Sequence, residues 1–62
     1  MNQRFAMDQR VRIVSADPDY APVRGQVGTV VGVADAGPLE YGVWLERDET
    51  VWQVPASGLE PA

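Results

Sequence analysis

The sequence predicts an all-β domain of five short strands, and three observations support this. Valine occurs ten times among the 62 residues, and β-branched side chains suit the half-buried surface of a pleated sheet. Six glycines and five prolines interrupt the chain at short intervals, as turns between strands do. No stretch has the apolar spacing of a long amphipathic helix. A chain of this length forms one domain, residues 1–62, of which we expect residues 1–8 to be a disordered tail.

The first strand is expected over residues 10–14, where apolar and basic residues alternate. Val11 and Ile13 then lie on one face of the strand and the arginines on the other, because successive side chains point to opposite faces. The next segment, residues 15–25, contains two prolines and a glycine. Regular strand pairing is excluded there, so we predict a long loop.

The second strand is expected over residues 26–34. Its two internal glycines predict a bulge or a sharp bend, as small barrels need at their corners. A bulge would reverse the register, which leaves open which of its valines face inward. In the third strand, residues 41–46, Val43 and Leu45 share a face and Trp44 takes the opposite one.

The fourth strand, residues 50–54, follows a short polar link, so it forms a hairpin with the third. We place Trp52 and Val54 on its inward face. Residues 55–58 have the composition of a single 3₁₀ turn, and residues 59–61 form a short closing strand.

This order of elements resembles the SH3-like small barrel. The similarity is most local at residues 54–60, which look like the stretch where an SH3 domain leaves its fourth strand, makes a 3₁₀ turn and closes. Residues 24–30 resemble the Gly-x-x-Gly-x-Val strand opening of related barrels, including KOW motifs and the barrel of the nitrile hydratase β subunit. The implied fold is a five-stranded SH3-like small barrel with one 3₁₀ turn before the last strand.

Composition excludes most catalytic chemistry. The chain has no cysteine, histidine or lysine, so disulfides, thiolate metal sites, Ser-His nucleophiles and Schiff bases are ruled out. Asp17 and Asp19 lie two residues apart on one loop and not across a cleft, as paired catalytic carboxylates would. Asp17 is better explained as the start of a turn before Pro18 than as half of a calcium site. We therefore expect no enzymatic activity, no cofactor and no metal.

The net charge of −4 argues against a nucleic-acid binder. The first residues lack the apolar core of a signal peptide, and no apolar run is long enough to span a membrane. We expect a cytoplasmic protein without membrane contact, either a monomer or a weak homodimer.

The arginines allow two interpretations. Arg10 and Arg12 point outward from the first strand and could form a phosphate-binding patch with Arg4 and Arg24. The favoured alternative is cross-strand pairing with acidic residues of the closing strand, for example Glu60.

Trp44 and the acidic residues near it suggest a protein-binding surface. Exposed tryptophan is enriched at interface hot spots, and acidic clusters steer basic partners. The alternatives are that the loop of residues 15–25 covers Trp44, and that the acidic residues only form a solvated turn. The candidate surface comprises Trp44, Tyr41, Tyr20, Glu46, Asp48 and Glu49.

A further similarity covers about residues 5–61. It is carried by residues 11–15 (VRIVS), 17–18 (DP), 24–32 (RGQVGTVVG), 41–43 (YGV), 51–52 (VW) and 59–61 (LEP). These segments resemble immunity-protein family 31, small proteins associated with bacterial polymorphic toxin systems. The resemblance implies a binder that neutralises a cognate toxin. Two other functions remain open: a KOW-type nucleic-acid or ribonucleoprotein adaptor that uses Arg10, Arg12 and Arg24, and an accessory barrel subunit of a larger complex.

Overall fold

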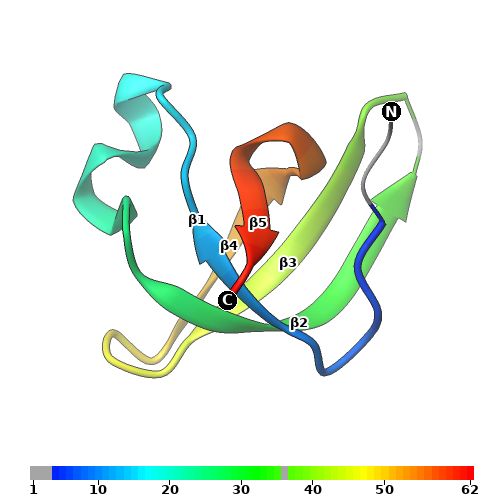
Figure 1. Ribbon diagram of the computed structural model, residues 1–62, viewed down its shortest axis with the longest axis horizontal. Helices are drawn as coiled ribbons and strands as arrows, with labels where there is room; N and C mark the ends of the chain where they lie inside the picture. The colour runs from blue at the N-terminus through cyan, green and yellow to red at the C-terminus, as the bar shows by residue number, and fades with distance from the viewer. Residues whose placement is uncertain (1–3, 36) are drawn as a thin grey trace.

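The computed structural model describes residues 4–35 and 37–62. Five strands and two short 3₁₀ helices follow one another along the chain (Figure 1). Their bounds are β1 Arg10–Ile13, η1 Pro18–Val23, β2 Val27–Asp35, β3 Leu39–Leu45, β4 Thr50–Pro55, η2 Ala56–Gly58 and β5 Leu59–Pro61. The predicted all-β class, the five strands and the 3₁₀ turn before the last strand are confirmed.

All five strands belong to one antiparallel sheet in the order β4-β3-β2-β1-β5. The sheet curves around its own core, and β2 bends most visibly (Figure 1). The end strands β4 and β5 each finish in a proline, which lacks the N–H group that a further strand would pair with. The hydroxyl group of Tyr20 also donates to the Gln53 carbonyl oxygen of β4, at 2.8 Å.

The inward face of the sheet holds one cluster of buried side chains. Its members are Phe5, Val11, Ile13, Val23, Val30, Tyr41, Val43, Leu45, Val54 and Leu59. The predicted inward residues of β1 and β3 are therefore in the core. In β4, Val54 is fully buried, whereas Trp52 is only half-buried and packs against the cluster from its edge. The inward placement of Trp52 is right, because it lies opposite the buried Val43 on β3.

The loop predicted between the first two strands contains the six-residue helix η1. Asp17 caps this helix: its side-chain Oδ1 accepts a hydrogen bond from the Asp19 backbone N–H at 2.9 Å. Pro18 occupies the first helical position, where its fixed φ and missing N–H are tolerated. The prediction that Asp17 starts a turn is confirmed, but the segment is more regular than expected.

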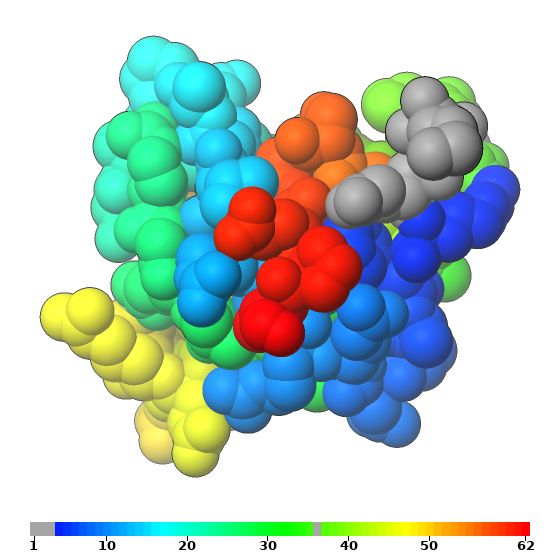
Figure 2. Space-filling view, viewed as in Figure 1, coloured from blue at the N-terminus to red at the C-terminus, as the bar shows by residue number. Residues whose placement is uncertain are grey.

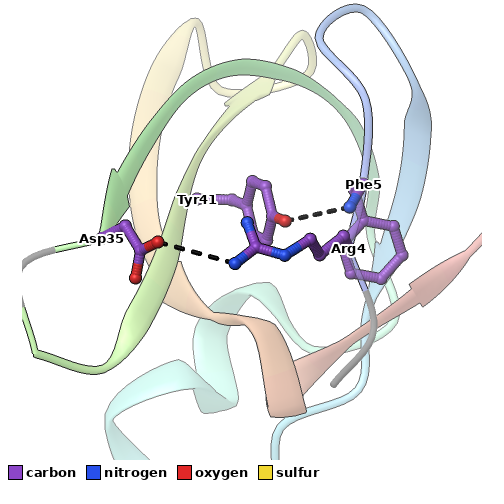
Figure 3. Close-up of polar contacts among 4 residues, drawn as sticks. All are labelled: Arg4, Phe5, Asp35 and Tyr41. Atoms are coloured by element: carbon purple, nitrogen blue, oxygen red, sulfur yellow. Dashed lines mark hydrogen bonds and ion pairs between the residues drawn. The ribbon is translucent and has the colours of Figure 1, made fainter. Parts of the chain in front are cut away.

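The predicted disordered tail is wrong for residues 4–8. Phe5 is buried in the core and packs edge-on against Tyr41, with 5.3 Å between ring centroids. The Phe5 backbone N–H donates to the Tyr41 hydroxyl oxygen at 2.9 Å (Figure 3). Asp8 N–H then donates to the Val30 carbonyl oxygen. Burial of the Phe5 ring and these backbone hydrogen bonds together offset the conformational entropy that the segment loses when it is ordered. Residues 1–3 lie outside the described residues.

The predicted bulge in the second strand is present. The pairing of β2 with β3 shifts register between Val30 and Gly32. Before the shift, Val30 lies opposite Val43 and faces the core, while Thr29 lies opposite Trp44 and faces outward. The bulge therefore allows β2 to change direction while keeping its first half in register with the core.

The two glycines of β2 differ in their surroundings. A Cβ atom at Gly28 would lie 2.5 Å from the Trp44 carbonyl oxygen and 2.6 Å from Cγ1 of Val43. A Cβ atom at Gly32 would meet nothing within 4 Å. Only Gly28 is needed for close approach between β2 and β3.

We therefore predict that Gly28→Ala destabilises the protein by about 1–3 kcal/mol, the range for overpacking a well-packed interior. Gly32→Ala is the matched control and should change the free energy of unfolding by less than about 0.5 kcal/mol. Urea unfolding followed by tryptophan fluorescence measures both. Equal effects of the two substitutions would show that the close contact at Gly28 does not matter.

Candidate interaction surface

The outward face of the sheet carries a continuous row of four side chains. Arg10 of β1 lies opposite Thr29 of β2, Thr29 opposite Trp44 of β3, and Trp44 opposite Val51 of β4. The chain neighbours of Trp44 on both sides are fully buried, so its side chain points away from the core. Alternation along the strand thus places the indole on the outer face, as predicted.

The β4 end of this row is apolar and accessible. Val51 is 54% exposed, and Trp44 is half-buried beside it. Trp44 is not among the partly buried residues that pack against the core. We call Trp44, Val51 and the turn described next the docking face.

The turn between β3 and β4 is rich in carboxylates. We use the name acidic turn for residues 46–49, which are Glu-Arg-Asp-Glu and are all exposed. The turn projects from the body of the molecule (yellow in Figure 2). Its position is held by two hydrogen bonds of Asp48: its backbone N–H donates to the Leu45 carbonyl oxygen at 3.1 Å, and its Oδ2 accepts from Gln26 Nε2 at 3.4 Å.

Tyr41 does not belong to this surface. Its side chain is 2% exposed and is part of the core. It lies two residues before Val43 on the same strand, so strand alternation puts both on the inward face. The prediction that Tyr41 is a surface residue is wrong for that reason.

Tyr20 also lies elsewhere. Its ring packs against Trp52 with 6.1 Å between centroids, and its hydroxyl group bonds to β4 at Gln53. The residue contributed by η1 therefore rests on Trp52, and the expected proximity of Tyr20 to Trp44 is wrong. Four of the six predicted residues remain on the docking face: Trp44, Glu46, Asp48 and Glu49.

Sequence reasoning missed Val51. Its signal was present in the hairpin: once Leu45 and Thr50 pair across a four-residue turn, the next pair outward must be Trp44 and Val51. The cross-strand pairing of a hairpin follows from its turn length.

Three of the four arginines considered for phosphate binding, Arg4, Arg12 and Arg24, have separate local partners. Arg12 Nη1 lies 3.1 Å from Glu60 Oε2, which confirms the favoured cross-strand pair. Arg24 donates to the carbonyl oxygens of Ser15 and Asp17. Arg4 pairs with Asp35 at 3.6 Å (Figure 3). These contacts engage the guanidinium groups at different places on the molecule.

A shallow depression of about 350 Å³ lies between the N-terminal segment, the loop before β3 and η2. Its lining includes Pro38, Leu39, Pro55 and the Arg4–Asp35 ion pair. Both ion-pair side chains are more than half exposed, so the depression is open to solvent. Across residues 4–35 and 37–62, no three acidic side chains gather as metal ligands would. Within the same ranges, no helix is long and apolar enough to cross a membrane.

No family model matches the chain, and no curated protein sequence matches it either.

Tyr20 has a perturbed environment. Burial of the phenol raises its pKa, and the carboxylates of Glu40, Asp17 and Asp19 raise the pKa further. The neutral phenol is thus favoured in the folded protein, where it donates to Gln53. The stabilisation that the neutral Tyr20 phenol provides is fully present below the pKa of this group in the unfolded chain, near 10. It is lost as the pH rises through the higher pKa of the group in the folded protein.

We predict that the free energy of unfolding falls above about pH 10 more steeply for the native sequence than for Tyr20→Phe. Urea unfolding at several pH values between 8 and 11 measures the difference. The two proteins are otherwise identical, so the difference between their curves reports on Tyr20. Parallel curves for the two proteins would contradict the prediction.

Proposed function

We propose that this chain is a small, acidic, non-enzymatic domain that binds another protein through the docking face. The observation that carries the proposal is the Trp44–Val51 pair on the outer face of the sheet, in which Val51 is exposed and Trp44 half-buried, directly beside the acidic turn. Tryptophan at the centre of an apolar patch is the residue type that most often dominates binding energy.

The rigidity of the position supports this role. Trp44 lies on β3, which is paired on one side with β2 and on the other with β4. A side chain on a strand held from both sides loses little conformational freedom when a partner binds, which reduces the entropic cost of association. Gln26, which directly precedes β2, donates a hydrogen bond to the Asp48 carboxylate of the acidic turn, so the turn also has a defined position.

The partner we propose is a cognate toxin, which the domain neutralises by covering part of its surface. The resemblance to immunity-protein family 31 supports this proposal, and so does the net charge of −4. Neutralisation by occlusion requires no catalytic group in the binder. On this proposal the domain acts in the cytoplasm, and its curved sheet is an SH3-like barrel. An accessory subunit of a larger complex would use the same docking face.

Alanine at Trp44 tests the proposal. We predict that Trp44→Ala reduces the yield of co-purified partner from the native host at least tenfold, as expected when a hot-spot side chain worth about 2 kcal/mol is removed. The melting temperature should stay nearly unchanged, because Trp44 is outside the core cluster. Affinity purification with quantitative mass spectrometry measures the yield, and circular dichroism measures the melting temperature.

A matched pair of valine substitutions provides the control. Val51→Arg places a bulky cation next to Trp44, whereas Val33→Arg places it at another exposed valine, toward the far end of β2. Val51→Arg should lose the same partner and Val33→Arg should retain it. A partner retained by Trp44→Ala and by Val51→Arg would refute the docking face.

A further inference from the structure

We infer that the docking face takes an arginine-bearing basic segment of the partner, with a guanidinium group stacked on the Trp44 indole and paired with the Glu46 carboxylate. This inference rests on the proposed function and adds the chemistry of the partner. The observations that point to it are the spacing of these two side chains, the uncompensated charge of the acidic turn and the shape of a guanidinium group.

The spacing follows from the strand. Glu46 comes directly after the last residue of β3 and two residues after Trp44. Glu46 is exposed, and its Cα atom lies no more than about 7 Å from that of Trp44, the span of two extended residues. The glutamate side chain can therefore bring its carboxylate to the edge of a planar group that stacks on the indole at about 3.5 Å, within reach of the N–H groups of that planar group.

The carboxylates of the acidic turn form no ion pair in the described part of the chain. Three carboxylates and one arginine give residues 46–49 a net charge of −2. The ion pairs formed by the described residues are Arg4–Asp35 and Arg12–Glu60, and neither involves the turn. The side-chain contact made by Asp48 is with the neutral amide of Gln26. The turn therefore presents a negative potential beside the apolar pair, which a basic partner surface complements.

Arginine fits this arrangement better than lysine. Its planar guanidinium group stacks on aromatic rings and donates two parallel hydrogen bonds to one carboxylate, whereas an ammonium group is a compact, strongly hydrated charge. A second copy of this chain fits less well, since it would bring another chain of net charge −4 to the same face.

A phage-displayed library of random twelve-residue peptides tests the inference. The library is selected against the native protein, Glu46→Lys and Asp19→Lys. Both variants replace one exposed carboxylate by one cation, so they have the same net charge and differ only in position. We expect arginine to be enriched at least threefold over the unselected library for the native protein and for Asp19→Lys, and not for Glu46→Lys. Replacing the arginine of a selected peptide by lysine should weaken its binding about tenfold.

Two measurements separate the alternatives. Selected peptides should lose binding to Trp44→Ala. Peptides that need Trp44 but show no arginine excess would overturn the arginine inference and leave the proposed function intact. Peptides that bind Trp44→Ala unchanged would overturn both the inference and the proposed function, and a selection that enriches no peptide would overturn the inference.

Sedimentation equilibrium of the native protein provides the last check: self-association that Trp44→Ala abolishes would identify a second copy as the occupant and overturn the inference. If Glu46→Lys fails to fold, as judged by circular dichroism, Glu46→Gln is used in its place. Arginine should then again not be enriched among the selected peptides.

Discussion

The structure depends on the close approach of β2 to β3 at Gly28. A single five-stranded sheet can enclose a core only if it bends strongly, and this bend brings the backbone of β2 against the Trp44 carbonyl oxygen and the side chain of Val43. No side chain fits at Gly28. The bulge after Val30 then turns the second half of β2 away. With these two features the described residues, 4–35 and 37–62, bury ten hydrophobic side chains in one cluster.

The same contact links the fold to the proposed binding surface. Trp44 contributes its backbone to the packing at Gly28 and its side chain to the outer face. Because β3 is a central strand with a fully buried inward side, every second residue must point outward. A small protein has little apolar surface to spare for stability. A tryptophan left on the outer face, outside the core cluster, therefore favours a role in binding over a role in stability.

Local patterning explains which parts of the fold and of the candidate site were predictable. Alternation identified the inward residues of β1, β3 and β4, and Trp44 as outward. The pairing of Arg12 with Glu60 and the turn at Asp17 also followed from residue chemistry. Tyr41 could have been placed correctly, because it lies two residues before Val43 on the same strand and therefore on the same, inward face. Tyr20 could not, because no local pattern determines where η1 packs on the sheet.

The sequence by itself determined the strands, the inward and outward faces of β1, β3 and β4, and the absence of histidine, cysteine and lysine chemistry. These follow from period-two alternation, turn residues and composition, which are local properties. The tertiary structure decided that Phe5 enters the core and that Tyr20 rests on Trp52. Both contacts join residues that are distant along the chain, and they form only when the sheet has curved around one core. Nothing in the local chain therefore specifies them.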